Sequence, residues 1–475
     1  MNETRPPVVA ILGHVDHGKT TLLDKIRKTN LAKRESGGIT QHIGAYQIEF
    51  ASGKGKSQKV TFIDTPGHAA FAKMRSRGAQ ATDLAILVVA ADEGVKEQTR
   101  ESFSHIKAAK IPYLVAITKI DLPKAEAQKI KEQLLDMDIE LAEAGGEVPA
   151  VSVSGLTGEG VSQLLKEIIS LAEKASLEAD KEADFQGIVI ESSKDSRRGA
   201  LNTVLVKSGT LRVKDELIVN GSSVTVRALF NDLGRPVDLA VPSDPVVVLG
   251  LSEPLEAGSI IGKEINIKKE KKKEEEREKD IFAKKEKKLT LLIKADAQGT
   301  LEAILNNLPS DVQIVHSGIG EVTDSDVFLA QASGLEIIAF RVKVHSSAKR
   351  LAADNGVLVK EFALIYELLE DVDRSVLRLL SPDIEKEIAG QAEIVAEFEI
   401  DKKRVAGCRV TQGEINRQQT VAIKRSETVL KEEVKISSMK HLKEDISLAK
   451  KGQEFGVTFS PLVDFKIGDV IISYK

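Results

Sequence analysis

The chain has 475 residues, a formal net charge of −4, 42% hydrophobic residues, 4% aromatic residues and no Trp. This length exceeds what one hydrophobic core usually serves, so we expect about three to five domains. The charge balance excludes a chain-wide basic surface for nucleic acid, and the scarcity of aromatic residues argues against base-stacking platforms.

The cysteine content and the apolar runs indicate a compartment. The single cysteine, Cys408, can form neither an internal disulfide nor a cysteine-based zinc site, which fits a reducing environment. The longest apolar run, Leu84 to Ala91, is far shorter than the roughly 20 residues that a membrane helix needs. The N-terminal sequence lacks a signal-peptide pattern. We therefore expect a soluble, cytoplasmic protein with no membrane partner.

Residues 1–176 alternate apolar strands with helical patterns, which predicts a mostly parallel α/β sheet. A polar turn joins the second and third of these strands, so we expect an antiparallel hairpin at one edge. The expected strands are Val8–Leu12, Tyr46–Phe50, Val60–Asp64, Leu84–Ala90, Tyr113–Ile117 and Ala150–Val153.

The first strand runs into a glycine-rich segment that matches G-x-x-x-x-G-K-[ST] in full. Its glycines let backbone N–H groups turn toward phosphate oxygens, and the following helix adds the positive end of its dipole. We expect Lys19 to reach the β and γ phosphates and Thr20 to bind Mg²⁺. The predicted phosphate-binding residues are Gly13, His14, Val15, Asp16, His17, Gly18, Lys19, Thr20, Thr21 and Gly67.

A second motif, residues 64–68, places an acid at the end of a strand. Asp64 can hold Mg²⁺ through water while the Gly67 N–H approaches the γ-phosphate. Hydrolysis depends mostly on orienting the attacking water, and His68 is the candidate catalytic residue. The glycines of residues 35–44 predict a switch whose Thr40 joins the Mg²⁺ shell only when the γ-phosphate is present.

Residues at two later strand ends can distinguish guanine from adenine. The Asp121 carboxylate can accept hydrogen bonds from the N1–H and the exocyclic amine of guanine, which adenine does not offer in that arrangement. Motifs at successive strand ends form the ligand crevice of an open α/β sheet, so the sequence predicts GTP or GDP as the ligand. The predicted guanine-binding residues are Thr118, Lys119, Asp121, Ser154, Gly155 and Leu156.

The rest of the chain divides by composition. Residues 177–267 carry short β-rich runs, including Val224 to Leu229 as one strand, and predict a small β-barrel. Residues 268–288 mix charges of both signs, which favours a solvated linker over an RNA-binding patch. Residues 289–360 predict an α/β sandwich.

A connecting helix and a second barrel are expected after this sandwich. Residues 361–390 have helical spacing, which leaves open whether the connecting helix packs or stands free. Residues 391–475 repeat the outline of the first barrel.

These motifs resemble those of the translational GTPases, and within them the bacterial translation initiation factor 2 family. The resemblance begins in the phosphate loop, in residues 36–46 and in residues 64–68. It covers almost the whole chain, because it continues through residues 294–300, 318–327, 365–367 and 406–408.

The resemblance implies a P-loop GTPase domain, a β-barrel, an α/β/α sandwich, a connecting helix and a terminal barrel. In the family the terminal barrel holds formylmethionyl initiator tRNA on the small ribosomal subunit, and joining of the large subunit triggers GTP hydrolysis. It also implies a monovalent cation near Asp16. We expect a monomer with no DNA partner. The implied tRNA contacts are Lys440, His441, Lys443, Glu454, Phe455 and Gly456.

The sequence departs from the family pattern at four positions. Thr118 stands in place of Asn, which predicts weaker bracing of the guanine pocket, and Leu156 stands in place of Lys. Phe455 replaces Cys and Leu442 replaces an aromatic residue. The last two motivate a second hypothesis, a GTP-gated ribosome-binding scaffold that joins subunits without recognising tRNA. Another translational GTPase is a third, which the sandwich between two barrels argues against.

Overall fold

A computed structural model describes residues 2–29, 40–52, 56–219, 222–263, 288–380, 388–400, 403–425, 428–442, 444–460 and 463–474. Within these residues, contacts divide the chain into two compact units, Met1–Val376 and Leu377–Lys475. The expectations for the switch before Thr40, for nearly all of residues 268–288 and for Lys443 lie outside the described residues.

The first domain is built on one sheet whose strands, in order, are β3 (Gly44–Ser52), β4 (Lys56–Asp64), β2 (Val8–Gly13), β5 (Leu84–Ala90), β6 (Tyr113–Thr118) and β7 (Ala150–Ser152). The expected hairpin forms, because β3 and β4 pair antiparallel at the edge while β2, β4, β5, β6 and β7 pair in parallel. Every residue of β2 and β5 is buried, as in parallel sheets covered on both faces.

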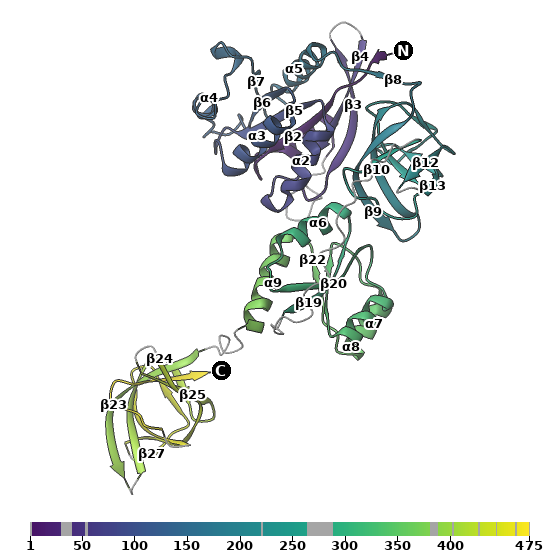
Figure 1. Ribbon diagram of the computed structural model, residues 1–475. Helices are drawn as coiled ribbons and strands as arrows, with labels where there is room; N and C mark the ends of the chain where they lie inside the picture. Colours follow the sequence, from purple (N-terminus) through teal and green to yellow (C-terminus); the bar gives the residue numbers. More distant parts are fainter. Residues whose placement is uncertain are drawn as a thin grey trace. The chain divides into compact units, whose positions relative to one another are not determined.

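Helices cover both faces of this sheet (Figure 1). Apolar side chains of α1 (Lys19–Arg27) and α5 (Val161–Lys174) share one core with the sheet. The opposite core contains side chains of α2 (Ala72–Ala81), α3 (Glu97–Ala109) and α4 (Ala127–Leu135). None of the described helices is both long and apolar enough to cross a membrane.

The second domain is the expected β-barrel. Its sheet has the order β13 (Ser222–Thr225), β12 (Glu216–Val219), β18 (Ile260–Gly262), β9 (Gln186–Asp195), β10 (Gly199–Ser208), β17 (Pro245–Leu249), β14 (Ala228–Phe230) and β15 (Pro236–Val237). Short strands β11 (Leu211–Arg212) and β16 (Leu239–Ala240) pair beside it. The prediction of one strand from Val224 to Leu229 is wrong. The chain changes partner there, because the Val226 N–H donates to the Asp215 carbonyl and the Arg227 N–H to the Leu249 carbonyl.

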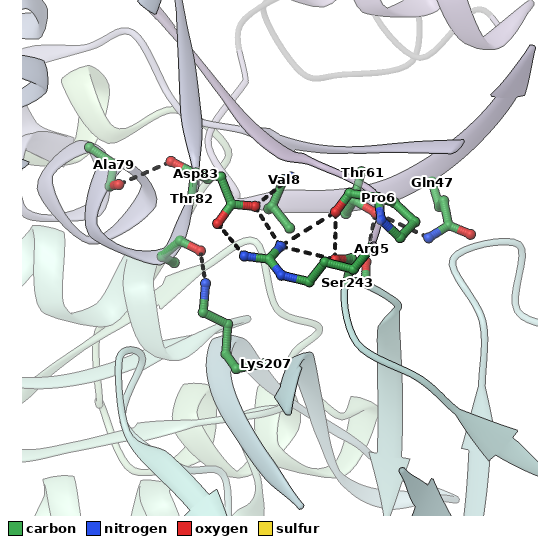
Figure 2. A network of polar contacts seen from close by, with 11 residues as sticks. Arg5, Pro6, Val8, Gln47, Thr61, Ala79, Thr82, Asp83, Lys207 and Ser243 are labelled. Atoms are coloured by element: carbon green, nitrogen blue, oxygen red, sulfur yellow. Dashed lines mark hydrogen bonds and ion pairs between the residues drawn. The ribbon is translucent and has the colours of Figure 1, made fainter. Parts of the chain in front are cut away.

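A buried polar network joins this barrel to the first domain (Figure 2). Arg5 follows β1 (Asn2–Thr4), which pairs with β8 (Glu178–Asp180). The Arg5 guanidinium donates to both oxygens of Asp83, at 2.6 and 2.7 Å, and to the Ser243 hydroxyl at 3.2 Å. Asp83 also accepts from the Val8 N–H at 2.9 Å, and the Thr61 hydroxyl donates to the Ser243 carbonyl at 2.6 Å. The barrel is thus tied to Arg5, which lies between β1 and β2, and to Thr61 of β4.

Asp83→Ala is expected to destabilise the first unit by about 2 kcal/mol, because it leaves Arg5 without its carboxylate in a largely buried position. The two side chains are only 16% and 9% exposed. The measurement is the melting temperature of the full chain, with the exposed Glu253→Ala as the matched control. A melting temperature equal to that of the control would contradict the role given to this network.

The third domain is the expected α/β/α sandwich. Its parallel sheet has the order β20 (Val312–Ile319), β19 (Leu289–Ala295), β21 (Glu336–Phe340) and β22 (Val359–Phe362). One face packs on α7 (Asp324–Ser333) and α8 (Ser346–Asp354) through a shared apolar core. Helix α6 (Gln298–Asn307) contacts β19 and β20, and Figure 1 shows it with α9 (Ile365–Leu380) on the other side of the sheet.

The connecting helix α9 packs along its first half. Ile365, Leu368 and Val372 are almost fully buried. The Lys360 ammonium at the end of the domain's sheet donates to the Asp371 carboxylate at 2.9 Å. Since these contacts tie the start of α9 to the third domain, the question left open by the spacing is answered for this half of the helix.

The described end of the predicted switch also contacts the third domain. The His42 imidazole lies 3.0 Å from the Asp296 carboxylate, which is also 3.0 Å from the Arg341 guanidinium. Burial lowers the pKa of His42, but the hydrogen bond and charge of Asp296 outweigh it and raise the pKa above its ordinary value. Glu191 of β9 accepts from the Gly299 N–H at 3.1 Å beside this pair. The Ile43 N–H of the switch also donates to the Glu191 carboxylate, at 3.5 Å. The switch therefore contacts both neighbouring domains.

The second unit is the expected terminal barrel. Its strands, in order, are β23 (Ile388–Ile400), β30 (Val470–Tyr474), β25 (Thr420–Arg425), β26 (Thr428–His441), β29 (Glu454–Ser460), β24 (Lys403–Asn416) and β28 (Leu448–Lys450), with β27 (Glu444–Asp445) paired to β26. An additional pairing of β23 with β24 closes the barrel around its own apolar core.

Candidate nucleotide-binding site

A cavity of about 260 Å³ lies at the carboxyl edge of the first sheet, where β2, β4, β6 and β7 end. Apart from Leu122, every lining residue is one that the sequence predicted. The lining residues are Val15, Asp16, Gly18, Lys19, Thr20, Thr21, Thr40, Gly67, His68, Thr118, Lys119, Asp121, Leu122, Gly155 and Leu156. The structure therefore brings the predicted phosphate, metal and base motifs to one place.

The glycines of the phosphate loop are required by its geometry. Gly18 caps α1 with φ of 81°, in the left-handed region that glycine adopts at no steric cost. A Cβ on Gly13 would lie 2.5 Å from the Val88 carbonyl oxygen. Gly67 comes close to this loop from the second motif, since its Cβ would lie 2.5 Å from the Lys19 Nζ. A side chain at Gly67 would thus fill the space next to the lysine.

The predicted residues outside the lining support the loop from behind. The carbonyls of Gly13 and His14 accept hydrogen bonds from the Lys19 Nζ, at 3.0 and 2.5 Å. The His17 side chain is fully buried, with its Nδ1 3.4 Å from the Val88 carbonyl, and His17 does not line the cavity. Ser154 is also buried, and its hydroxyl accepts from the Thr157 N–H at 3.0 Å.

The Lys19 ammonium is held in a desolvated position. Burial lowers its pKa to about 8, although the negative charge of Asp64 acts in the opposite direction. Phosphate oxygens entering the cavity would replace the two loop carbonyls as partners and restore the charged form. An anion in the cavity would therefore stabilise the charged form of Lys19.

Nucleotide binding is expected to weaken as the pH rises above about 8. Below that pH, Lys19 is protonated with or without the ligand; above it, the free protein loses the proton and must take it up again on binding. Affinity should then fall by up to about tenfold per pH unit. Calorimetry of a slowly hydrolysed GTP analogue at pH 7.5 and 9, in buffers of different ionisation enthalpy, measures this uptake. Equal proton uptake at both values would contradict the low pKa.

The three predicted metal ligands offer the oxygen donors that Mg²⁺ prefers. The hydroxyls of Thr20 and Thr40 lie 2.6 Å apart on the cavity wall. Asp64 ends β4 and is 7% exposed. Asp64 is not among the residues that line the cavity, but its negative charge acts on Lys19. By donor chemistry, the two hydroxyls on the wall and this carboxylate fit a hard divalent cation.

His68 is positioned by a residue that the sequence analysis missed. Arg75 of α2 is fully buried, and its guanidinium donates to the carbonyls of Pro66 and Gly67, at 3.2 Å each, and to the carbonyl of His68. The Nη2 atom of the same guanidinium donates to the Glu101 carboxylate at 2.6 Å. Arg75 therefore fixes the backbone that carries His68. Nothing in the sequence distinguishes Arg75 from the other cations on predicted helices.

Burial and the positive charge of Arg75 lower the pKa of His68 to about 4. Its Nδ1 accepts from the Ala70 N–H at 2.9 Å, so the neutral ring carries its proton on Nε2. A neutral imidazole at pH 7 can orient a water molecule without adding charge to the site.

Thr118 braces the base end of the cavity against the phosphate loop. Its hydroxyl donates to the His17 carbonyl at 2.6 Å. Whether this brace is weaker than that of the family's Asn stays a prediction. Lys119 contacts Asp92 and Glu93 at 3.2 and 3.1 Å. Burial lowers the pKa of Lys119, but these hydrogen bonds outweigh it and raise the pKa above its ordinary value. The lysine stem is thereby held along the cavity.

The remaining residues at the base end leave room in the cavity for the ring of a nucleotide base. Asp121 is exposed on the cavity wall, and Leu156 is 73% exposed. Gly155 packs against the start of α1, because its Cβ would lie 2.9 Å from the Leu22 nitrogen. The Leu156 carbonyl accepts from the Lys25 ammonium at 2.9 Å, which anchors this loop.

Comparison with known proteins identifies the family. Residues 5–174 match the model of the elongation factor Tu GTP-binding domain, residues 184–263 that of elongation factor G domain 2, and residues 263–373 that of translation-initiation factor 2. The translation initiation factor IF-2 of Anoxybacillus flavithermus is 42% identical over 99% of this chain and 68% of its own length. This chain belongs to the translation initiation factor IF-2 family.

Other IF-2 relatives are longer. The factor from Nitratiruptor sp. is 44% identical over all of this chain, and that from Moorella thermoacetica 43% over 99% of it. The chain spans 59% and 54% of their lengths. A solved structure described as GDP-bound aIF5B from Aeropyrum pernix is similar, with a TM-score of 0.52 and 26% identity over 99% of this chain and 92% of that one.

The residues that the IF-2 family pattern implies for tRNA binding lie on both sides of the wall of the terminal barrel. Lys440 and His441 end β26 beside Glu454 and Gly456 of β29, and the His441 Nδ1 lies 2.5 Å from the Glu454 carbonyl. Phe455, however, is only 4% exposed and pairs with Cys408 inside the barrel. Its side chain is part of the core and cannot meet a ligand at the surface without a rearrangement.

Proposed function

We propose that this chain is a GTP-dependent translation initiation factor. It binds formylmethionyl initiator tRNA, places it on the small ribosomal subunit, promotes joining of the large subunit and hydrolyses GTP to GDP and phosphate on the ribosome. The observation that carries the proposal is the single cavity onto which the phosphate loop, His68 and the base-end motifs all open. The IF-2 relatives, named translation initiation factors, supply the cellular process.

In this proposal, the phosphate end of the cavity binds the phosphates and neutralises their charge. The loop N–H groups and Lys19 bind the phosphates, and a bound Mg²⁺ supplies further charge neutralisation between the phosphate oxygens. Thr20, Thr40 and Asp64 would hold that ion. The exposed Asp16 carboxylate on the cavity wall would hold a monovalent cation.

The other residues orient the attacking water and select the guanine base. Asp121 selects guanine by accepting its N1–H and amine hydrogens, while Thr118, Lys119, Ser154, Gly155 and Leu156 form and support the base pocket. The Gly67 N–H donates to the γ-phosphate, and His68 orients the attacking water beside it. Arg75 acts only through the backbone, as a positioning residue.

The proposed partners are the small and then the large ribosomal subunit and formylmethionyl initiator tRNA, with the chain acting as a monomer in the cytoplasm. The exposed Lys440 and Glu454 and the neighbouring His441 and Gly456 are the proposed tRNA contacts on the terminal barrel. Phe455 would shape this surface from inside the core.

Protection of the ester bond of formylmethionyl initiator tRNA against spontaneous hydrolysis tests the tRNA part. The full chain is expected to slow hydrolysis of this ester and to leave unformylated methionyl-tRNA unprotected. Lys440→Ala is expected to weaken the protection, with the exposed Lys466→Ala as a matched control on the same barrel.

A second candidate function is a ribosome-binding, GTP-gated scaffold that joins subunits without recognising tRNA. Two observations favour it: Phe455 is withdrawn into the core, and Leu442 is 91% exposed where the family pattern has an aromatic residue. Equal ester lifetimes with and without the chain, together with ribosome-stimulated GTP hydrolysis, would replace the first candidate with this one.

A further inference from the structure

One face of α3 is linked to both phosphate motifs of the first domain. Gln98 and Glu101 are three residues apart in this helix, so their side chains project from the same face. The Gln98 Oε1 accepts a hydrogen bond from the Val15 N–H of the phosphate loop at 3.0 Å. The Glu101 carboxylate accepts from the Arg75 guanidinium at 2.6 Å. A single helix therefore contacts the phosphate loop directly and the second motif through Arg75.

The contact with Gln98 involves two consecutive residues of the phosphate loop. The sequence predicted Val15 as a phosphate-binding residue, and Val15 does line the cavity. Its N–H is engaged by the Gln98 Oε1 in this arrangement. Burial lowers the pKa of the neighbouring His14 imidazole, and hydrogen bonding to Gln98 acts in the opposite direction. One side chain of α3 thus meets the backbone of one loop residue and the ring of the next.

The two segments linked to α3 also touch each other. A Cβ on Gly67 would lie 2.9 Å from the Val15 nitrogen and 3.1 Å from the Val15 Cα, so the two backbones are in direct contact. Arg75 donates to the carbonyls of Pro66 and Gly67 at 3.2 Å each. The Val15 amide is therefore in contact both with Gln98 and with the residue proposed to meet the γ-phosphate.

Helix α3 is itself anchored in the first domain. Phe103 and Ile106 are buried in the apolar core on one face of the sheet. Just before the helix, the Val95 N–H donates to the Gln133 side chain of α4 at 2.8 Å. Because the helix is held before its start and along its length, its side chains can fix the position of the phosphate loop.

An amide side chain suits the position of Gln98. An apolar side chain there would leave the Val15 N–H without its acceptor, which is costly in a partly buried position. A carboxylate would supply an acceptor, but it would also add a negative charge close to a loop that binds phosphates. The neutral amide oxygen holds the loop without opposing the charge of the ligand.

We propose that Gln98 is a positioning residue for the nucleotide phosphates, which it serves by holding the phosphate loop through the Val15 N–H. Glu101, on the same face of α3, holds the segment around Gly67 through Arg75, so that the helix sets the spacing between the two motifs. This inference rests on the proposed GTPase function and deepens it. Neither Gln98 nor Glu101 lines the cavity, so both act through other residues.

The test is the affinity of the full chain for GDP and for a slowly hydrolysed GTP analogue, measured by calorimetry. Gln98→Met keeps the length of the side chain and removes its acceptor. It is expected to bind both nucleotides about tenfold more weakly, which corresponds to loss of one hydrogen bond. Arg100→Ala, at an exposed position of the same helix, is the matched control. Equal or tighter binding by Gln98→Met would overturn the proposal, because the Val15 N–H would then serve the phosphates without Gln98.

Hydrogen exchange of the Val15 amide separates positioning of the loop from a general effect on the fold. In the nucleotide-free chain with labelled valine, NMR should show an exchange rate of this amide that rises about tenfold in Gln98→Met. The exchange rate in Arg100→Ala should equal that of the unmodified chain. A weaker affinity with unchanged exchange of the Val15 amide would contradict the proposal, since the loop would not be held through this group.

Glu101→Ala tests the other contact of α3. Loss of the carboxylate that binds Arg75 should disturb the backbone around Gly67, at the γ-phosphate end. We expect an unchanged affinity for GDP and a rate of ribosome-stimulated hydrolysis at saturating GTP that is about tenfold lower. An unchanged rate, or an equal loss of affinity for GDP and GTP, would show that Glu101 does not act on the second motif.

Failure of the inference differs from failure of the proposed function. If the unmodified chain binds GTP and Gln98→Met binds it equally well, only the role given to Gln98 is wrong. If the unmodified chain does not bind GTP, the proposed function fails and the inference fails with it.

Discussion

His68→Ala is expected to lower the ribosome-stimulated rate of GTP hydrolysis by about 1,000-fold while leaving GTP affinity nearly unchanged. The neutral imidazole of His68 lines the cavity beside Gly67 and carries its proton on Nε2. Alanine removes the group that orients the water and keeps the loop backbone, which Arg75 holds through the carbonyls of Pro66 and Gly67.

The measurement is single-turnover hydrolysis with both ribosomal subunits present, together with a separate GTP-binding titration. His316→Ala, at an exposed position in the third domain, is the matched control. A variant that hydrolyses GTP at the rate of this control would remove His68 from the mechanism. A large loss of affinity would instead indicate that His68 mainly shapes the phosphate site.

Asp121→Asn is expected to change the ratio of GTP to xanthosine triphosphate affinity by about 1,000-fold in favour of xanthosine. Asp121 is exposed at the base end of the cavity, where its carboxylate can accept both guanine hydrogens. Xanthine carries a carbonyl in place of the exocyclic amine, so an amide side chain can donate to it. With guanine the same amide NH₂ would face the guanine amine.

Competition between the two nucleotides for the full chain measures this exchange. Asp136→Asn, on an exposed surface of the same domain, controls for the change of charge. If GTP stays preferred in Asp121→Asn by the original ratio, the base-recognition role belongs to another residue.

The sequence predicted which residues line one cavity because its motifs follow buried strands. A parallel sheet brings the carboxyl ends of its strands to one edge, so the order of motifs along the chain was enough to place Lys19, Gly67 and Asp121 together. The edge hairpin was also predictable, since a short polar turn leaves adjacent strands little choice but to pair.

Contacts between distant segments could not be predicted. Arg75 looks like a solvated cation on a helix, and only the fold shows its guanidinium under the loop that carries His68. Gln98 lies 83 residues from Val15, and helical spacing does not identify its partner. Phe455 was expected in a binding pocket, but the alternation of β29 directs its side chain into the barrel core.

The proposed GTPase function is tested most directly by the rate of GTP hydrolysis by the full chain, alone, with small subunits, and with both subunits. We predict slow turnover alone, little change with small subunits, and a large stimulation when the large subunit joins. ATP should not be hydrolysed under any of these conditions. A hydrolysis rate that is the same with and without ribosomal subunits, or an equal rate with ATP, would contradict the proposed function.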